Sequence, residues 1–204
     1  MTTAAPRLPF KEQMHLARED AILRAACQLL GAKPFDAVTM DDVAETVGIA
    51  KASVYKHFAS KEDLCCAAMV QVLGHVRVYL AALDGAMAPI DKLRAVARWS
   101  VERLLAQEMP LLPSPHSPLR AVLMAHSECR NGLALVSDEL GQWITQAQAQ
   151  AAIDPALPPL LVLYTLCARA CDPVVGFLQS SGQYQDAEIV DLVLRTCFGG
   201  LQAR

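Results

Sequence analysis

The sequence is poor in charge and in aromatic residues. Of its 204 residues, 19% are charged and 5% are aromatic, whereas 53% are hydrophobic, which is slightly more than soluble domains usually carry. Much of the excess is alanine and leucine, which favour helix, and the alternation that marks a strand never runs beyond a few residues. A chain of this length buries a core without metals or disulfides. These features predict an all-α protein.

The sequence also lacks the signals of a secreted or membrane protein. Its seven cysteines are odd in number and include no CxxC pair, which argues against a disulfide framework and against a structural zinc site. The N-terminus has no signal-like apolar core, and no apolar run reaches the roughly 18 residues of a membrane helix. The longest candidate, near residues 156–168, is broken by Pro158 and Pro159. We therefore expect a cytoplasmic protein without a membrane span.

Motifs for catalysis are missing as well. The C-terminal region has no Gly-rich phosphate loop, no nucleophile elbow and no HExxH helix. The sequence therefore predicts that the chain is not an enzyme, and it indicates neither a cofactor nor a resident metal.

The first third of the chain carries the start and stop signals of four helices. We expect a flexible arm over residues 1–10 and helices over about 11–30, 39–47, 51–58 and 60–86. Gly31 is the expected C-cap of the first of these helices. Thr39 is the expected N-cap of the second, and Ser60 with Asp63 resembles a capping box for the fourth.

Residues 39–58, TMDDVAETVGIAKASVYKHF, read as a helix-turn-helix. Gly48 permits a sharp turn because glycine tolerates a positive φ. The positions expected to lock the helices together are apolar: Val43, Val47, Ile49, Val54 and Phe58. Lys51 and Tyr55, four residues apart, share a different face of the third helix. In such a motif the second helix enters the major groove of DNA.

The charge pattern supports a local DNA-binding surface. Residues 1–75 hold 8 basic against 9 acidic residues, so this part is not basic overall. Between Glu45 and Glu62, however, there is no acid, and the basic residues in that window are Lys51, Lys56 and Lys61, with His57 beside them. A local positive surface is what neutralisation of phosphates requires.

The stretch from Ile22 to Leu64 closely resembles the TetR family of repressors. The resemblance depends on ILRAACQLL, Thr39, DDVAETVGIAKASVYKHF and SKEDL, and it covers about a third of the chain. It implies a helix-turn-helix domain over 11–65 that binds a near-palindromic operator. The residues it implies in DNA contact are Thr39, Lys51, Ala52, Ser53, Tyr55, Lys56, His57 and Lys61. Ala50 departs from the pattern, because many relatives carry a polar cap there.

Each of these residues also has an ordinary structural interpretation. Tyr55 can pack against the first helix, and Lys56 and Lys61 can belong to a solvated face, which is the usual place for lysine. The DNA-binding hypothesis depends on the combined spacing of these residues.

Beyond the fourth helix the sequence predicts further helices. They span about 91–108, capped by Asp91, and then 119–128, 132–152, 157–180 and 185–202. The four prolines of residues 110–118 predict a loop. Pro173 predicts a break, with Asp172 and Pro173 as the N-cap and first residue of a new helix.

The resemblance implies that residues 75–204 bind a ligand and dimerise. The expected homodimer interface is about 157–180 and 185–202. Two apolar stripes there fit core and interface equally well: Leu160, Leu161, Tyr164, Cys167 and Cys171 in the first segment, and Ile189, Leu192, Val193, Thr196 and Phe198 in the second.

A ligand pocket is expected among the helices of residues 91–180, for an apolar or aromatic effector. The candidate lining residues are Trp99, Arg103, Met124, His126, Trp143 and Tyr164, each of which also fits a core position. The favoured function is a ligand-released repressor. The alternative is a redox- or metal-responsive regulator on the same scaffold, suggested by His126, Glu128 and Cys129 and by Cys167 and Cys171.

Overall fold

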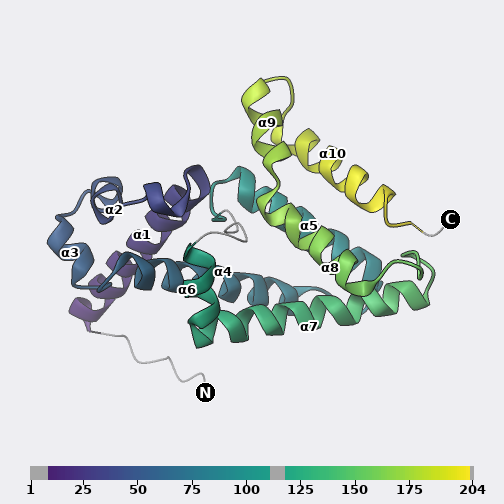
Figure 1. The fold of residues 1–204 in the computed structure, drawn as a ribbon, viewed down its shortest axis with the longest axis horizontal. Coiled ribbons are helices and arrows are strands. Elements are labelled where there is room, and N and C mark those ends of the chain that lie inside the picture. Colours follow the sequence, from purple (N-terminus) through teal and green to yellow (C-terminus); the bar gives the residue numbers. More distant parts are fainter. Residues whose placement is uncertain (1–8, 111–117, 203–204) are drawn as a thin grey trace, which may run out of the picture.

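The structure, a computed structural model, describes residues 9–110 and 118–202 (Figure 1). These residues form helices and no strands, which confirms the all-α prediction. The helices are α1 (Phe10–Ala32), η1 (Phe35–Ala37), α2 (Met40–Val47), α3 (Lys51–Tyr55), α4 (Lys61–Ala82), α5 (Pro89–Leu105), α6 (Pro118–Ala125), α7 (Ser127–Ala149), α8 (Pro159–Cys167), η2 (Ala168–Cys171), α9 (Pro173–Ser181) and α10 (Asp186–Gly199). Most of the arm expected over 1–10 lies outside the described residues, and Phe10 already begins α1.

The prediction that Gly31 ends α1 is wrong. The helix continues to Ala32 and stops where Lys33, which precedes Pro34, adopts an extended conformation. A residue before proline is disfavoured in a helix. A Cβ atom at Gly31 would lie 3.2 Å from the carbonyl oxygen of Met109. The glycine therefore permits a close approach of two backbone segments and does not cap the helix.

Several other predicted boundaries are wrong by a few residues. α3 ends at Tyr55 rather than Phe58, and α4 ends at Ala82 rather than residue 86. Asp91 does not cap α5, because Pro89 is its first residue and needs no backbone N–H there. α5 ends at Leu105, α6 already begins at Pro118, within the predicted loop, and α7 begins at Ser127. Residues 111–117 of that loop lie outside the described residues.

The predicted break at Pro173 is confirmed. The single segment expected over 157–180 is α8, η2 and α9 in succession. The Asp172 carboxylate accepts a hydrogen bond from the backbone N–H of Val174 at 3.0 Å and so caps α9. Its other oxygen lies 2.5 Å from a guanidinium nitrogen of Arg169. Asp172 is 5% exposed, so this ion pair neutralises a buried charge at the kink.

The described helices enclose two hydrophobic clusters. The first joins α1 to α4 with Met109, α6 and the start of α7. The second joins the end of α4, α5, most of α7 and α8 to α10. Figure 1 shows α1–α3 at one end of the molecule and α10 at the other, with α4 and α7 running between them. α4 and α7 therefore contribute to both clusters and connect the two parts.

Two segments have the length and hydropathy of a membrane helix, contrary to the sequence expectation. They are Lys61–Ala82 and Pro159–Ser181, each with a mean hydropathy of 1.5. Half of the first is buried inside the protein, as expected of a core helix, and the second is interrupted by η2 and the buried Asp172. Length and composition alone are weak evidence for a membrane span.

Candidate DNA-binding surface and interior cavity

The helix-turn-helix is built by local hydrogen bonds that the sequence predicts. Thr39 caps α2, since its hydroxyl oxygen accepts from the backbone N–H of Asp42 at 3.1 Å. The Asp42 carboxylate accepts in return from the N–H of Thr39 at 2.8 Å, which completes a capping box. At the other end of α2, Gly48 has φ of 74° and turns the chain toward α3. The predictions that Thr39 caps the second helix and that Gly48 permits the turn after it are confirmed.

The apolar edge of the motif packs as predicted. Val43 and Val54 are fully buried, and Phe58 is 7% exposed. Val47 and Ile49 are half-buried and pack against the same cluster, which includes Ile22 and Leu30 of α1. This packing fixes the orientation of α3, so that its remaining face points to solvent.

The solvent face of α3 carries the predicted contact residues. Lys51, Ala52, Tyr55 and Lys56 are exposed, and Ser53 is half-buried. The Tyr55 side chain is 46% exposed, so it is not sequestered against α1. Thr39, also exposed, precedes this face at the start of α2. Five of the eight predicted contact residues therefore reach solvent on the helix-turn-helix itself.

Lys51, the first residue of α3, is held by α2. Its ammonium donates to a carboxylate oxygen of Asp41 at 2.7 Å, and this bond raises the pKa of Lys51. Ala50 precedes α3 and makes no side-chain cap, as the sequence predicted. The start of α3 is thus restrained by an ion pair between side chains rather than by an N-cap.

His57 and Lys61 face the protein more than the sequence suggested. The His57 side chain is 5% exposed and stacks on His15 with ring centroids 4.3 Å apart. The Lys61 ammonium lies 4.0 Å from the centroid of the Phe35 ring and donates to the Phe35 carbonyl oxygen at 3.1 Å. The DNA contacts of both residues remain predictions, and these two side chains also connect α3 and α4 to the preceding elements.

The sequence did not indicate that the start of α1 reaches the same end of the molecule. Phe10–Arg18 are all exposed, and the stacking of His15 on His57 brings this part of α1 beside the end of α3. Lys11 and Arg18 add positive charge there. The sequence gives little indication of this positive charge, because Glu12 follows Lys11 and Glu19 follows Arg18.

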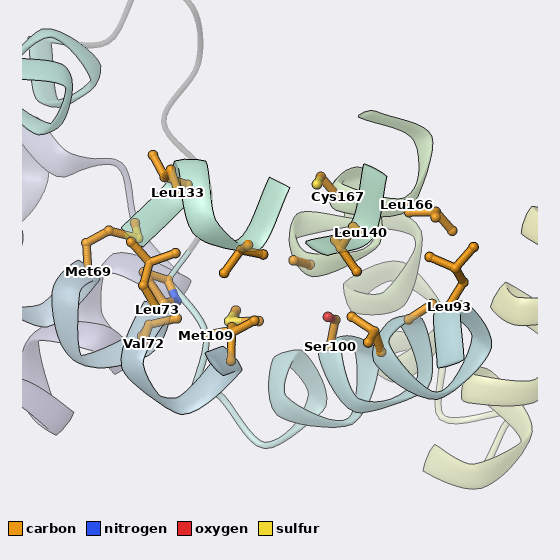
Figure 2. A pocket seen from close by; sticks show the side chains of 16 residues that line it. Met69, Val72, Leu73, Leu93, Ser100, Met109, Leu133, Leu140, Leu166 and Cys167 are labelled. Carbon is orange, nitrogen blue, oxygen red and sulfur yellow. The ribbon is translucent and has the colours of Figure 1, made fainter. Parts of the chain in front are cut away.

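A cavity of about 140 Å³ lies between the two hydrophobic clusters. Figure 2 shows that side chains of α4, α5, α7 and α8 converge on it. The lining residues are Met69, Val72, Leu73, Val76, Leu93, Val96, Ala97, Ser100, Met109, Pro110, Leu133, Val136, Leu140, Leu166, Cys167 and Ala170. Among these side chains, the Ser100 hydroxyl is the single oxygen. The cavity is therefore suited to an apolar guest.

The six predicted ligand-binding residues are not brought together, and none of them lines this cavity. Trp99 stacks on Tyr79, Arg103 forms an ion pair with Glu108 at 2.6 Å, and Trp143 is buried in the second cluster. Met124 and Tyr164 are exposed, and His126 lies at the junction of α6 and α7. The sequence prediction chose large or polar side chains as the pocket lining. Most of the side chains that line the cavity are instead aliphatic.

The structure also separates the two C-terminal stripes. Of the second stripe, Ile189, Val193 and Phe198 are buried in the second cluster and are core, whereas Leu192 is half-buried and Thr196 is exposed. Leu160, Leu161 and Tyr164 are 59%, 52% and 65% exposed on α8. Cys167 faces the cavity.

These features define a helix-turn-helix protein whose remaining helices enclose an apolar cavity. Residues 22–68 match the family model for bacterial regulatory proteins of the tetR family. The transcriptional regulator BetI of Rhizobium meliloti (strain 1021) is 34% identical over 91 residues, which are 44% of this chain and 45% of BetI. The chain thus matches less than half the length of this relative.

Solved structures share the fold over most of the chain. A TetR-family transcriptional regulator from Agrobacterium tumefaciens matches with a TM-score of 0.64 and 23% identity, over 92% of this chain and 99% of that one. AibR, solved with isovaleryl coenzyme A and operator DNA, matches with a TM-score of 0.63 and 20% identity, over 89% and 98%. The chain thus carries a segment that matches the tetR family model, and its fold is that of solved TetR-family regulators. The proteins it matches here are named as regulators rather than enzymes, in agreement with the prediction.

Proposed function

We propose that the chain is a homodimeric repressor that binds a near-palindromic operator and is released by a small apolar effector. The observation that carries the DNA-binding part is the face of α3 that exposes Lys51, Ala52, Tyr55 and Lys56 while Val54 is buried. Lysine ammonium groups neutralise phosphates, and small Ala52 leaves room for the bases to approach the backbone. A repressor acts by occupying its operator, and the proposed role of this surface is to bind that operator.

A dimer is proposed because operators of such motifs are read as paired half-sites, one helical turn apart. The proposed interface is the one expected from the sequence, within 157–180 and 185–202. Exposed apolar side chains on α8 and α9 support it: Leu160, Leu161, Tyr164, Val174 and Phe177 are 49–74% exposed. Several large exposed apolar side chains mark an interaction surface more often than single ones do.

The effector is proposed to occupy the cavity between the two clusters. Its volume of about 140 Å³ is close to that of a cavity that holds benzene, roughly 150 Å³. We therefore infer a short apolar or aromatic group, with one hydrogen-bonding atom opposite Ser100. AibR was solved with isovaleryl coenzyme A, whose acyl group is short, branched and apolar.

The release mechanism follows from the position of α4. Met69, Val72 and Leu73 face the cavity, and the same helix begins at Lys61 beside the DNA-binding unit. A guest that fits better when α4 is displaced from α5 and α7 shifts the population toward that arrangement. Such a displacement changes the separation of the two recognition helices in a dimer and lowers operator affinity.

Footprinting tests the proposal. Purified full chain is incubated with the intergenic DNA next to its own gene, and protection from nuclease is mapped. We expect one protected near-palindrome whose half-site centres lie about one turn, roughly 34–36 Å, apart. Binding no stronger than to unrelated DNA, in this region and in a random-sequence selection, would contradict the proposal.

A further inference from the structure

Three metal-ligating side chains meet outside the cavity and the DNA-binding surface. Cys66 lies in the second turn of α4, Cys129 in the first turn of α7, and His126 at the junction of α6 and α7. Each offers one ligand atom, and these three atoms lie within 4.8 Å of one another. Cys66 is 3% exposed and Cys129 is fully buried, while His126 is half-buried. None of the three lines the cavity.

The backbone around these residues is fixed by hydrogen bonds. The N–H of His126 donates to the carbonyl oxygens of Val122 and Leu123 at 3.1 and 3.2 Å. The Arg130 guanidinium donates to the carbonyl oxygens of Met124 and Ala125, which holds the α6–α7 junction in place. The three ligands therefore stand on ordered elements, as a metal site requires.

The potential ligand atoms of this group have few hydrogen-bond partners among the described residues. The Nδ1 atom of His126 is buried and has no hydrogen-bond partner within the described part of the chain. The Cys129 thiol makes a long contact, 3.6 Å, with the carbonyl oxygen of Cys66, and it also interacts with the Cys66 thiol. A buried nitrogen without a partner is costly, and a bound cation would use its lone pair.

The distances are close to those of a zinc site. Tetrahedral Zn²⁺ with Zn–S of about 2.3 Å and Zn–N of about 2.0 Å places its ligand atoms roughly 3.5–3.8 Å apart. The observed limit of 4.8 Å therefore requires each ligand atom to move by less than about 1 Å.

The local charge favours a divalent ion. The carboxylates of Glu62, Asp63 and Glu128 lie near the two cysteines and add negative charge around the group. Zn²⁺ with two thiolates and a neutral imidazole has no net charge, whereas Cu⁺ with the same ligands is anionic. An anionic complex is disfavoured in a buried position beside acids.

We propose that Cys66, His126 and Cys129 form a Zn²⁺ site, with a water molecule as the fourth ligand. Binding releases the two thiol protons to solvent, and the thiolates bind the metal. The site joins α4 to α7 five residues after Lys61, so the ion would fix the DNA-binding unit against the cavity helices. The proposal does not depend on operator or effector binding, and it is tested on the free protein.

The experiment uses the full chain, stripped of metal with a chelator, reduced and titrated with Co²⁺ and then Zn²⁺. We expect one equivalent of Co²⁺ to produce a thiolate charge-transfer band that Zn²⁺ abolishes. Cys129→Ser and His126→Gln should weaken binding by more than the roughly 10–100-fold that loss of an outer-sphere partner causes. Cys65→Ser, at the neighbouring buried cysteine outside the group, should bind as the wild type does.

X-ray absorption of the zinc-loaded wild type provides a readout without any substitution. Two sulfur ligands and one imidazole nitrogen per zinc are expected. The proposal is overturned if the wild type binds no metal, if the zinc shows another ligand set, or if Cys129→Ser and Cys65→Ser bind equally well.

Discussion

The ammonium of Lys51 donates to a carboxylate oxygen of Asp41 at 2.7 Å, so that the first residue of α3 is tied to the first turn of α2. Both side chains are at least half exposed. Exposed ion pairs of this kind contribute little to stability. The ion pair orients Lys51, which is a predicted DNA-contact residue. It also places the negative charge of Asp41 on the surface that is proposed to face the phosphates of DNA.

Asp41→Asn should therefore change DNA binding without changing the thermal midpoint. We expect several-fold tighter binding to any duplex, because a repelling charge is removed and Lys51 becomes free to reach phosphates. The ratio of operator to unrelated DNA affinity should fall, because Lys51 loses its fixed direction. Fluorescence anisotropy with both duplexes measures this ratio. Asp186→Asn on α10 is the control, and equal behaviour of the two variants would contradict the role given to Asp41.

Asp42 makes the stability of the helix-turn-helix dependent on pH. Hydrogen bonds from Lys33 and from Thr39 lower the pKa of Asp42 to about 2. A folded-state pKa below the unfolded value of about 3.9 gives stability that is present above about pH 5 and is lost as the pH falls toward 2. Asp42→Asn should thus lower the thermal midpoint at pH 6, and the difference from the wild type should vanish near pH 2.

Thermal unfolding at several pH values checks this prediction. Asp36→Asn, at an exposed acid of η1, serves as the control and should follow the wild type throughout. A midpoint difference for Asp42→Asn that stays constant from pH 6 to pH 2 would show that the capping box is not the source of the effect.

The cavity should accept small apolar molecules. Toluene or xenon should raise the thermal midpoint of the wild type, since a guest that binds only the folded state stabilises it. Ala97→Leu projects a larger side chain into the lining and should remove most of this shift. Ala81→Leu, at an exposed position of α4, should leave the shift unchanged. A shift that is equal in all three proteins would place the binding site elsewhere.

The proposed dimer interface can be tested by charge. The double variant Tyr164→Glu with Phe177→Glu alters side chains that are 65% and 74% exposed, so the folded chain should tolerate it. We expect sedimentation equilibrium to report twice the 22.0 kDa chain mass for the wild type and the single mass for this variant. Val78→Glu, 71% exposed on α4, is the matched control. A monomeric wild type, or a dimeric double variant, would exclude this interface.

The sequence predicted the features that depend on neighbours along the chain. Thr39 caps α2 through its hydroxyl, Gly48 turns the chain through its positive φ, and Pro173 starts a new helix, so the residue type and its near neighbours were enough to predict each feature. Gly31 shows the limit of such reasoning, because the atom that requires a glycine there belongs to Met109.

Features assembled from distant segments could not be predicted in the same way. The cavity is lined by aliphatic side chains that are indistinguishable in sequence from core, whereas Trp99 and Trp143 pack elsewhere. The sequence suggested His126, Glu128 and Cys129 as metal ligands, but it did not suggest Cys66, which precedes His126 by sixty residues. Only the contact between α4 and α7 brings it to them.

Whether the exposed face of α3 binds DNA can be measured through the salt dependence of binding to the footprinted operator. Anisotropy titrations over a range of salt concentrations compare the wild type with Lys56→Ala and with Arg195→Ala, a control on α10. If Lys56 contacts a phosphate in each half-site, its variant should bind more weakly, and the log–log salt slope of the dimer should fall by about 1.8, about 0.9 for each of the two lost contacts. A Lys56→Ala protein with the affinity and slope of Arg195→Ala would contradict the claim.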